Sequence, residues 1–131
     1  MVYFESYSLN NFVSKEALIV CEPTTSATKI YEIMQKSRIR HLPVVVDGKA
    51  IGVLSDRDVQ FVSAWTSDGE LTAKDLMTPD PYSVPSTADL KEVVQEMSKK
   101  RINSVLIHDE KSRIVGIFTS TDALDLLAKV I

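Results

Sequence analysis

Two stretches of the sequence decide the fold: Gly52-Val53-Leu54-Ser55-Asp56-Arg57-Asp58 and Gly116-Ile117-Phe118-Thr119-Ser120-Thr121-Asp122. Each contains, in order, a glycine, two apolar residues, a hydroxyl residue, two variable residues and an aspartate. Each begins with residues that favour a strand and ends with residues that favour the first turn of a helix. A pattern this long, found twice at positions 64 residues apart (116 − 52), indicates an internal repeat.

The repeat continues upstream, where Arg38-Ile39 recurs 63 residues later (101 − 38) as Arg101-Ile102. The segments before these pairs have apolar residues at positions i, i+3, i+4 and i+7, which predicts an amphipathic helix in each copy. Thr24 and Thr87 stand just before these segments, where hydroxyl residues that begin helices are expected. The two apolar stripes are Ala27, Ile30, Tyr31 and Met34, and Leu90, Val93, Val94 and Met97.

Short apolar segments predict three strands in each copy. Asp47-Gly48 separates two of them and is a strong signal for a hairpin turn. A helix is expected after each hairpin, over residues 58–65 and 122–130, and a short one over residues 71–77, before Pro79 and Pro81. The predicted strands are Leu18-Ile19-Val20, residues 42–46 and residues 50–54, then Tyr82-Ser83-Val84, Val105-Leu106-Ile107 and residues 114–118.

We therefore predict an α+β (mixed α/β) fold made of two β-α-β-β-α repeats related by a pseudo-two-fold axis, with helices packed on small mixed sheets. Residues 1–65 are assigned to the first repeat with an N-terminal segment, residues 66–73 to a connector, and residues 74–131 to the second repeat. The two repeats are expected to form one module, because about sixty residues is at the small end for independent folding.

The composition excludes several classes of protein. The chain has 131 residues, of which 44% are hydrophobic and 25% charged, as in ordinary globular proteins. A single cysteine excludes an internal disulfide, and a net charge of −3 disfavours binding to nucleic acid. No apolar run approaches the roughly twenty residues that cross a membrane, and the first ten residues lack lysine and arginine. We expect a cytoplasmic protein.

The two strand-to-helix junctions admit two interpretations. Ser55 with Asp58, and Thr119 with Asp122, could be capping boxes that only begin a helix. Alternatively, the helix start and the hydroxyl could bind phosphate while the aspartate accepts hydrogen bonds from ribose hydroxyls. Arg57 could offset phosphate charge. The second interpretation makes each junction part of a site for a nucleotide.

Together these features resemble a tandem pair of CBS domains, which is also called a Bateman module. The stretch Arg38-Ile39-Arg40-His41-Leu42-Pro43-Val44-Val45 is similar to the central strand signature of that family. The two glycine-to-aspartate stretches resemble its ribose-phosphate motif, and the resemblance covers about residues 17–130. It implies a regulatory module that senses AMP, ADP, ATP or S-adenosylmethionine and transmits a conformational change to a partner protein.

The resemblance also implies two ligand clefts, each lined by both repeats. Leu106 stands where the first copy has Pro43, and Asn103-Ser104 where it has Arg40-His41, so the two clefts are not equivalent. Cleft 1 is assigned Val20, Cys21, Ile39, Arg40 and Pro43 for the base, with Thr119, Thr121 and Asp122 for ribose and phosphate. Cleft 2 is assigned Ser55, Arg57 and Asp58 for ribose and phosphate, with Ser83, Val84, Ile102, Asn103 and Val105 for the base.

Two other functions are alternatives to the regulatory one. A structural or dimerisation module without a ligand would use the Ser/Thr-x-x-Asp motifs only as helix caps. An enzyme is disfavoured, because the sequence has no paired catalytic carboxylates, no nucleophile with a base and no metal-ligand spacing. We expect no catalytic residue, no metal and no required cofactor. The resemblance implies a homodimer, for which Phe61-Val62-Trp65 and Leu124, Leu127 and Val130 could supply helix faces, and an effector protein of unknown identity.

Overall fold

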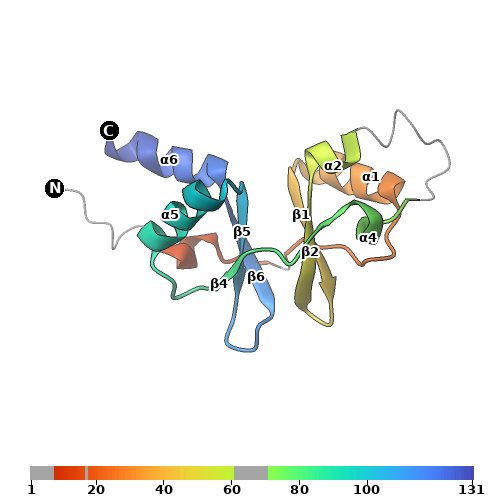
Figure 1. The fold of residues 1–131 in the computed structure, drawn as a ribbon, viewed down its shortest axis with the longest axis horizontal. Coiled ribbons are helices and arrows are strands. Elements are labelled where there is room, and N and C mark those ends of the chain that lie inside the picture. The colour runs from red at the N-terminus through yellow and green to blue at the C-terminus, as the bar shows by residue number, and fades with distance from the viewer. Residues whose placement is uncertain (1–7, 17, 61–70) are drawn as a thin grey trace. The chain divides into compact units, whose positions relative to one another are not determined.

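The computed structural model describes residues 8–16, 18–60 and 71–131, and the chain divides into two compact units. Unit 1 combines Met1–Leu18 with Tyr82–Ile131, and unit 2 is Ile19–Pro81 (Figure 1). Unit 2 thus contains the helix and hairpin of the first repeat, and unit 1 contains those of the second. Each unit is a small mixed α/β structure, as predicted, and each contains a three-stranded sheet.

Unit 2 is built around an antiparallel sheet with the strand order β1-β2-β3. Asp47 and Gly48 both have positive φ, of 51° and 81°, which is the conformation that a two-residue hairpin turn between β1 and β2 requires. Helices α1 and α2 lie side by side in this unit (Figure 1). The elements are α1 (Ala27–Ser37), β1 (His41–Val46), β2 (Lys49–Ser55), α2 (Asp56–Gln60), α4 (Ala73–Leu76) and β3 (Thr78–Pro79).

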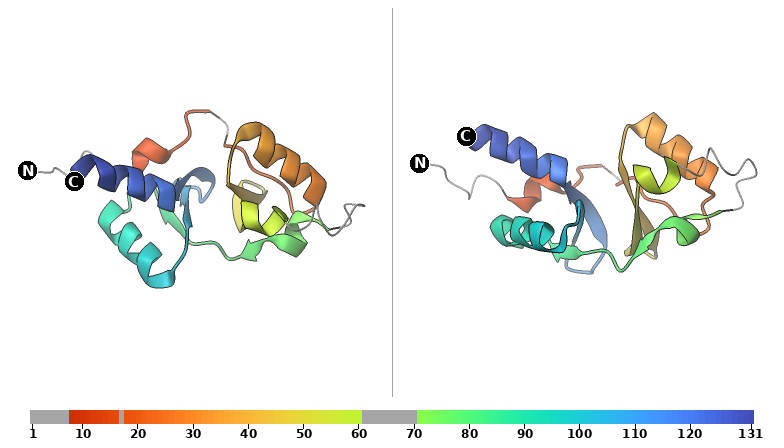
Figure 2. Two further views of the ribbon diagram at one scale, coloured as in Figure 1. Left: turned by 90° about the horizontal axis from the view of Figure 1, so that it is seen from above. Right: turned by 45° about the horizontal axis from the view of Figure 1, so that its top comes forward.

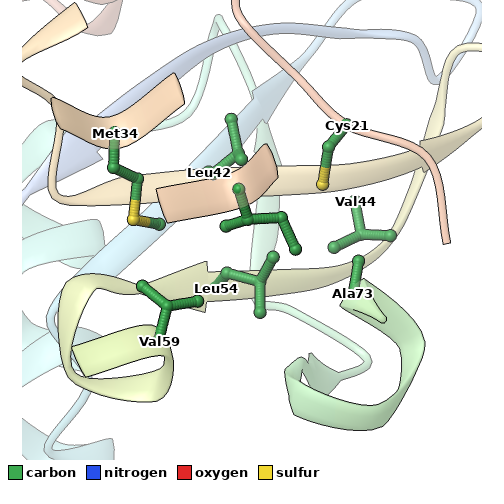
Figure 3. Close-up of a cluster of buried hydrophobic side chains, with 8 residues drawn as sticks. Cys21, Met34, Leu42, Val44, Leu54, Val59 and Ala73 are labelled. Carbon is green, nitrogen blue, oxygen red and sulfur yellow. The ribbon is translucent and has the colours of Figure 1, made fainter. Parts of the chain in front are cut away.

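The core of unit 2 lies between α1 and the β1–β2 hairpin. Leu42, Val44 and Leu54 point from the hairpin to one side, and Met34 of α1 packs on them (Figure 3). Val59 of α2 closes the cluster at one end. Burying apolar side chains of this size contributes about 1.5–3 kcal/mol each, so the hairpin and α1 stabilise one another. The cluster consists of Cys21, Ile30, Met34, Leu42, Val44, Leu54, Val59 and Ala73.

Unit 1 has the sheet order β4-β5-β6, in which β4 is parallel to β5 and β6 is antiparallel to it. The short helix η2 lies against β6 (Figure 2). The rings of Phe12 and Phe118 meet edge to face at a centroid distance of 4.8 Å, beside the fully buried Leu9. The elements are η2 (Leu9–Phe12), β4 (Ser83–Pro85), α5 (Leu90–Lys100), β5 (Ser104–His108), β6 (Ile114–Thr119) and α6 (Ser120–Val130).

The N-terminal segment, which the sequence assigned to the first repeat, packs instead in the unit of the second. Val13 bridges to Gly116, and the N–H of Ser14 donates to the carbonyl of Val115 at 2.8 Å. In unit 2 the segment with α4 and β3 takes the corresponding place, because Thr78–Pro79 pairs with β2 at Val53 and Gly52. In each sheet, the glycine of the repeated motif therefore pairs with a segment from the other half of the chain. The segment at Gly116 precedes α1, and the segment at Gly52 precedes α5.

The predicted strand Leu18-Ile19-Val20 is wrong, since this segment has only a parallel bridge between Cys21 and Val44. Pro43 explains the difference between the two units. Extending the ladder back to Ile19 would require a donor at Pro43, and proline has no N–H. In unit 1 the corresponding residue is Leu106, whose N–H donates to the carbonyl of Tyr82 at 2.9 Å, and β4 forms there.

The helix starts differ in detail from the expected ones. The N-cap of α1 is Ser26, whose hydroxyl accepts from the N–H of Lys29, and the N-cap of α5 is Asp89. Thr24 and Thr87 stand two residues earlier, so neither is the cap. Helix α2 is described only as far as Gln60, and the remainder of the helix predicted over residues 58–65 lies outside the described residues.

Candidate functional site

The junction between β2 and α2 in unit 2 is held by two hydrogen bonds that backbone N–H groups donate. The N–H of Ser55 donates to Oδ2 of Asp58 at 2.7 Å. The N–H of Asp56 donates to the carbonyl of Arg40 at 2.8 Å, which ties the start of α2 to the segment just before β1. Ser55 and Asp58 are half-buried, whereas the side chain of Arg57 is exposed.

The junction between β6 and α6 in unit 1 repeats this geometry. Both the N–H and the hydroxyl of Thr119 donate to Oδ2 of Asp122, at 2.7 and 3.0 Å. The N–H of Ser120 donates to the carbonyl of Asn103 at 3.0 Å, which matches the bond from Asp56 to Arg40 in unit 2. Asp122 is half-buried, and Thr121 is exposed. The duplicated motif thus gives the same local structure twice.

These hydrogen bonds show how the two interpretations of the motif fit together. A capping box is present at Thr119 and Asp122, so this aspartate does begin a helix. In both units the cap uses only Oδ2, and within the described residues Oδ1 of Asp58 and of Asp122 has no hydrogen-bond partner. The cap therefore fixes the direction of each carboxylate and leaves one oxygen to accept hydrogen bonds from a ligand.

The residues assigned to the base differ in how accessible their side chains are. Cys21 and Pro43 are buried in unit 2, and Val84 and Val105 are buried in unit 1. The accessible members include Val20, with 38% of its surface exposed, and Arg40 and Asn103, which are both exposed. Ile39, Ser83 and Ile102 are half-buried. Each predicted cleft draws residues from both units.

The two units differ in charge at corresponding positions of the site. Unit 2 has Arg40 and Arg57, where unit 1 has Asn103 and Thr121. Asn103 is also engaged locally, because its Oδ1 accepts from the hydroxyl of Ser120 at 3.1 Å. The sequence pattern treated Ser120 as a variable position, and nothing in the order of residues indicated this side-chain pair. Unit 2 therefore carries the more positive half-sites.

Cys21 is a buried thiol with no sign of activation. Burial, with a smaller contribution from the carboxylate of Glu22, raises the pKa of Cys21 from 9.0 to about 11. The thiol is therefore neutral at physiological pH and packs as a small apolar group among Val44 and Ala73 (Figure 3).

The raised pKa of Cys21 predicts a loss of stability at alkaline pH. The folded state holds the thiol proton more tightly than the unfolded state does. The contribution of the protonated thiol to the free energy of unfolding is therefore complete below pH 9 and is lost as the pH rises toward 11. The expected loss is up to about 2–3 kcal/mol of unfolding free energy. Urea denaturation of the wild type and of C21A between pH 8 and about 11 measures it. A wild-type curve that remains parallel to the C21A curve contradicts the prediction.

Two negative findings apply to the part of the chain that the structure describes. No group of three or more His, Cys, Asp or Glu side chains could hold a metal ion there. None of the helices in those residues combines the length and the apolar character needed to cross a bilayer.

Comparison with known families identifies this duplicated architecture. The model of the CBS domain matches residues 12–63 and again residues 73–129, so the chain belongs to the CBS domain family. The family model thus matches the chain twice, in agreement with an internal repeat. The resemblance drawn from the Arg38–Val45 stretch and the two junctions is thus confirmed.

Individual relatives agree with the family assignment. Inosine-5′-monophosphate dehydrogenase from Korarchaeum cryptofilum is 29% identical over 112 residues, which are 86% of this chain and 22% of that protein. That of Thermoplasma acidophilum is 29% identical over 102 residues, or 78% of this chain and 20% of that protein. The chain thus spans about a fifth of the length of these relatives.

Solved structures show the same fold. The CBS domain pair of protein MJ0100, in complex with 5′-methylthioadenosine and S-adenosyl-L-methionine, has a TM-score of 0.81 at 26% identity, covering 95% of this chain and 98% of that one. CBSX2 in complex with AMP has a TM-score of 0.80 at 21% identity, covering 94% of this chain and 97% of that one. The mixed α/β fold of a CBS pair is therefore established for this chain.

Proposed function

We propose that this chain is a regulatory module that senses an adenosyl compound in clefts between its two repeats and transmits a conformational change to a partner. The observation that carries the proposal is the pair of equivalent carboxylates, Asp58 and Asp122. Each is half-buried at a strand-to-helix junction, oriented through Oδ2 by a backbone N–H, and open at Oδ1. The complex of the MJ0100 domain pair with two adenosyl compounds supports an adenosyl ligand.

The site residues take the following roles in this proposal. Asp58 and Asp122 accept hydrogen bonds from ribose hydroxyls through their open oxygens. The hydroxyls of Ser55 and Thr119, with Arg57 and Thr121, face the phosphate or sulfonium end. The base rests in cleft 1 against Val20, Cys21, Ile39, Arg40 and Pro43, and in cleft 2 against Ser83, Val84, Ile102, Asn103 and Val105. Because Cys21, Pro43, Val84 and Val105 are buried, their main chain and their exposed neighbours make the nearer contacts.

Regulation needs a second conformation and a recipient of the signal. A ligand shifts an equilibrium only by its different affinities for the two states. We place the recipient in another protein and propose a cytoplasmic, non-catalytic homodimer. Leu124 and Leu127 of α6, with 64% and 51% of their surfaces exposed, offer an apolar face for a second copy. The other proposed face, Phe61-Val62-Trp65, lies outside the described residues.

A thermal-shift panel tests the proposal. AMP, ADP, ATP and S-adenosylmethionine are compared with 2′-deoxy-AMP, which lacks one of the ribose hydroxyls that the aspartates bind. A ligand present at about 100 times its Kd adds about 2.7 kcal/mol of stability, which corresponds to roughly 10 °C in Tm for a chain of this length. We expect at least one ribonucleoside ligand to raise Tm and the deoxy analogue to raise it much less.

The alternative function is a structural module whose aspartates act only as helix caps. It is favoured by the capping box at Thr119 and Asp122, which is complete without a ligand. It predicts that no adenosyl compound changes Tm at millimolar concentration. That result would overturn the sensing proposal, because a ligand that binds only the folded state must stabilise it.

A further inference from the structure

The N-terminal segment (residues 8–14) packs beside the candidate site of unit 1. Phe12 of this segment is half-buried and lies against the apolar cluster that contains the fully buried Phe118 of β6. Phe118 immediately precedes Thr119, whose N–H donates to Oδ2 of Asp122 at 2.7 Å. The segment therefore contacts the strand that presents this carboxylate, one residue away from the group that orients it.

The same apolar cluster also holds the other side of the junction. Ala123 of α6 directly follows Asp122 and packs against the cluster. One core thus fixes the residue before Thr119 and the residue after Asp122. Phe12 belongs to this core through an edge-to-face contact with Phe118, at a centroid distance of 4.8 Å. Such a contact adds to the energy of apolar burial and has a defined geometry, so it restricts where the strand end can lie.

The attachment of the N-terminal segment to the sheet is short. It consists of the bridge between Val13 and Gly116 and the hydrogen bond from the N–H of Ser14 to the carbonyl of Val115. Helix η2 has only four residues, and so short a helix is not stable by itself. Segments held in this way open at a lower free energy than the whole structure does. We therefore expect this segment to undock from β6 without unfolding of unit 1.

The corresponding segment of unit 2 is attached more extensively among the described residues. Strand β3 pairs with β2 at two positions. The N–H of Ala73 donates to the carbonyl of Thr25 at 2.9 Å, and that of Lys74 donates to the carbonyl of Pro23 at 3.0 Å. These bonds fasten the start of α4 beside the junction that carries Asp58. The two junctions share one motif but differ in how firmly their neighbouring segment is held.

We propose that the N-terminal segment, through Phe12, is a positioning element for Asp122, and that docking of this segment on β6 is coupled to binding of the ligand at that carboxylate. The inference rests on the proposed function for the identity of the ligand, and it names the element through which the site of unit 1 is regulated. A ligand that binds the oriented carboxylate favours the docked segment, and undocking weakens binding by the same factor. Asp58 does not depend on this segment.

Amide hydrogen exchange of the full chain without ligand tests the positioning step. The reporter is the amide of Thr119, and the amide of Ser55 is the matched reporter in unit 2. We expect F12A to speed exchange at Thr119 by about tenfold, because the lost ring contact and apolar burial together exceed the free energy of that factor. Exchange at Ser55 should be unchanged. The amide of Leu106, in β5 of unit 1, is the reference for general loosening and should change much less.

Calorimetric titration with AMP tests the coupling. D58N leaves the proposed site at Asp122, and D122N leaves the one at Asp58, so F12A is combined with each of them. We expect F12A to raise Kd at least about fivefold in the D58N background, which is the lower end of typical coupling between sites, and to leave Kd unchanged in the D122N background. F12L retains apolar volume without the ring and should show the same order with smaller effects. The Tm of each variant, measured without ligand, verifies that it is folded.

Two results would overturn the inference. One is exchange at Thr119 that F12A leaves unchanged or raises no more than exchange at Leu106. The other is a change of Kd that is equal in the D58N and D122N backgrounds, since a general loss of structure would affect both sites. Absence of AMP binding by the wild type would instead overturn the proposed function and the coupling with it, while exchange at Thr119 decides separately whether Phe12 positions Asp122.

Discussion

Alanine at Gly116 is expected to lower the free energy of unfolding by about 3 kcal/mol, because the added methyl group has no space. A Cβ atom at this position would overlap the carbonyl oxygen of Phe12 and would lie 3.0 Å from Cα of Val13. Both obstacles are backbone atoms of the N-terminal segment. The segment would have to leave the sheet and give up the hydrogen bond from Ser14 to Val115. Phe12 would then lose its packing on Phe118.

Alanine at Gly52 is the matched comparison, because the two glycines occupy the same place in their repeats. The nearest atoms to a Cβ at Gly52 belong to the side chain of Met77, and the carbonyl oxygen of Thr78 lies at 3.0 Å. A methionine side chain is flexible and can turn aside, so we expect a smaller loss, of about 1 kcal/mol. Urea denaturation of G52A and G116A measures both effects.

The difference between the two variants tests the assignment of the N-terminal segment to unit 1. If G116A is no less stable than G52A, Phe12 and Val13 do not cross the sheet at Gly116. Deleting residues 1–14 provides the control, because the alanine substitution at Gly116 should then cost much less stability. Loss of the segment should leave the G52A effect unchanged.

The repeat made most of the fold predictable from the sequence. The stripes at Ala27 and Leu90, the Asp47-Gly48 turn and the two junctions are local patterns, and each gave the expected element. The exchange of the N-terminal segment could not be predicted in this way. Its helix η2 has only four residues, and its partner Gly116 lies about a hundred residues away in the chain. Hydrophobic periodicity and turn residues are local signals, so they do not predict which segments pair over such a separation.

Pro43 illustrates how one residue can have a structural consequence that the sequence pattern does not indicate. In the sequence its replacement by Leu106 in the second copy indicated a difference between the ligand clefts. In the structure the same exchange explains why β4 forms in unit 1 while unit 2 has only the Cys21–Val44 bridge. The missing N–H of proline is a property of the single residue, but its effect depends on which neighbouring strand requires a donor.

The two strand-to-helix junctions of the candidate site could also be predicted from the sequence. The spacing from Ser55 to Asp58 and from Thr119 to Asp122 indicated either a helix cap or a ribose acceptor, and the structure contains the hydrogen bonds of the cap with one carboxylate oxygen left open. The packing of α1 on α2 was not indicated by any sequence pattern, and it brings Tyr31 and Gln60 together from distant parts of the sequence.

Removing both aspartates is expected to abolish binding of the adenosyl ligand. Each ribose hydroxyl that loses a charged acceptor costs about 1.5–3 kcal/mol, so the D58N/D122N variant should bind at least about a hundredfold more weakly. Asparagine retains an oxygen that can accept the N–H of Ser55 or Thr119, so the helix starts are kept. D58A/D122A removes the cap as well and should also lower Tm.

The chain offers a matched control for this substitution. Thr72 and Asp75 at the start of α4 form a capping box in which the N–H and the hydroxyl of Thr72 donate to Oδ2 of Asp75, at 2.9 and 3.0 Å. The hydrogen bonds from Thr72 hold the pKa of Asp75 below its usual value. Asp75 belongs to neither predicted cleft. D75N should therefore perturb a helix cap of the same kind without changing ligand affinity.

The central claim is that Asp58 and Asp122 hold a ribose as well as beginning helices. Calorimetric titration of AMP into the wild type, D75N and D58N/D122N tests it most directly. The claim predicts the same Kd for the wild type and D75N, and loss of measurable heat for D58N/D122N although that variant remains folded. An affinity for AMP that is unchanged in D58N/D122N would contradict it and would leave the two aspartates as helix caps alone.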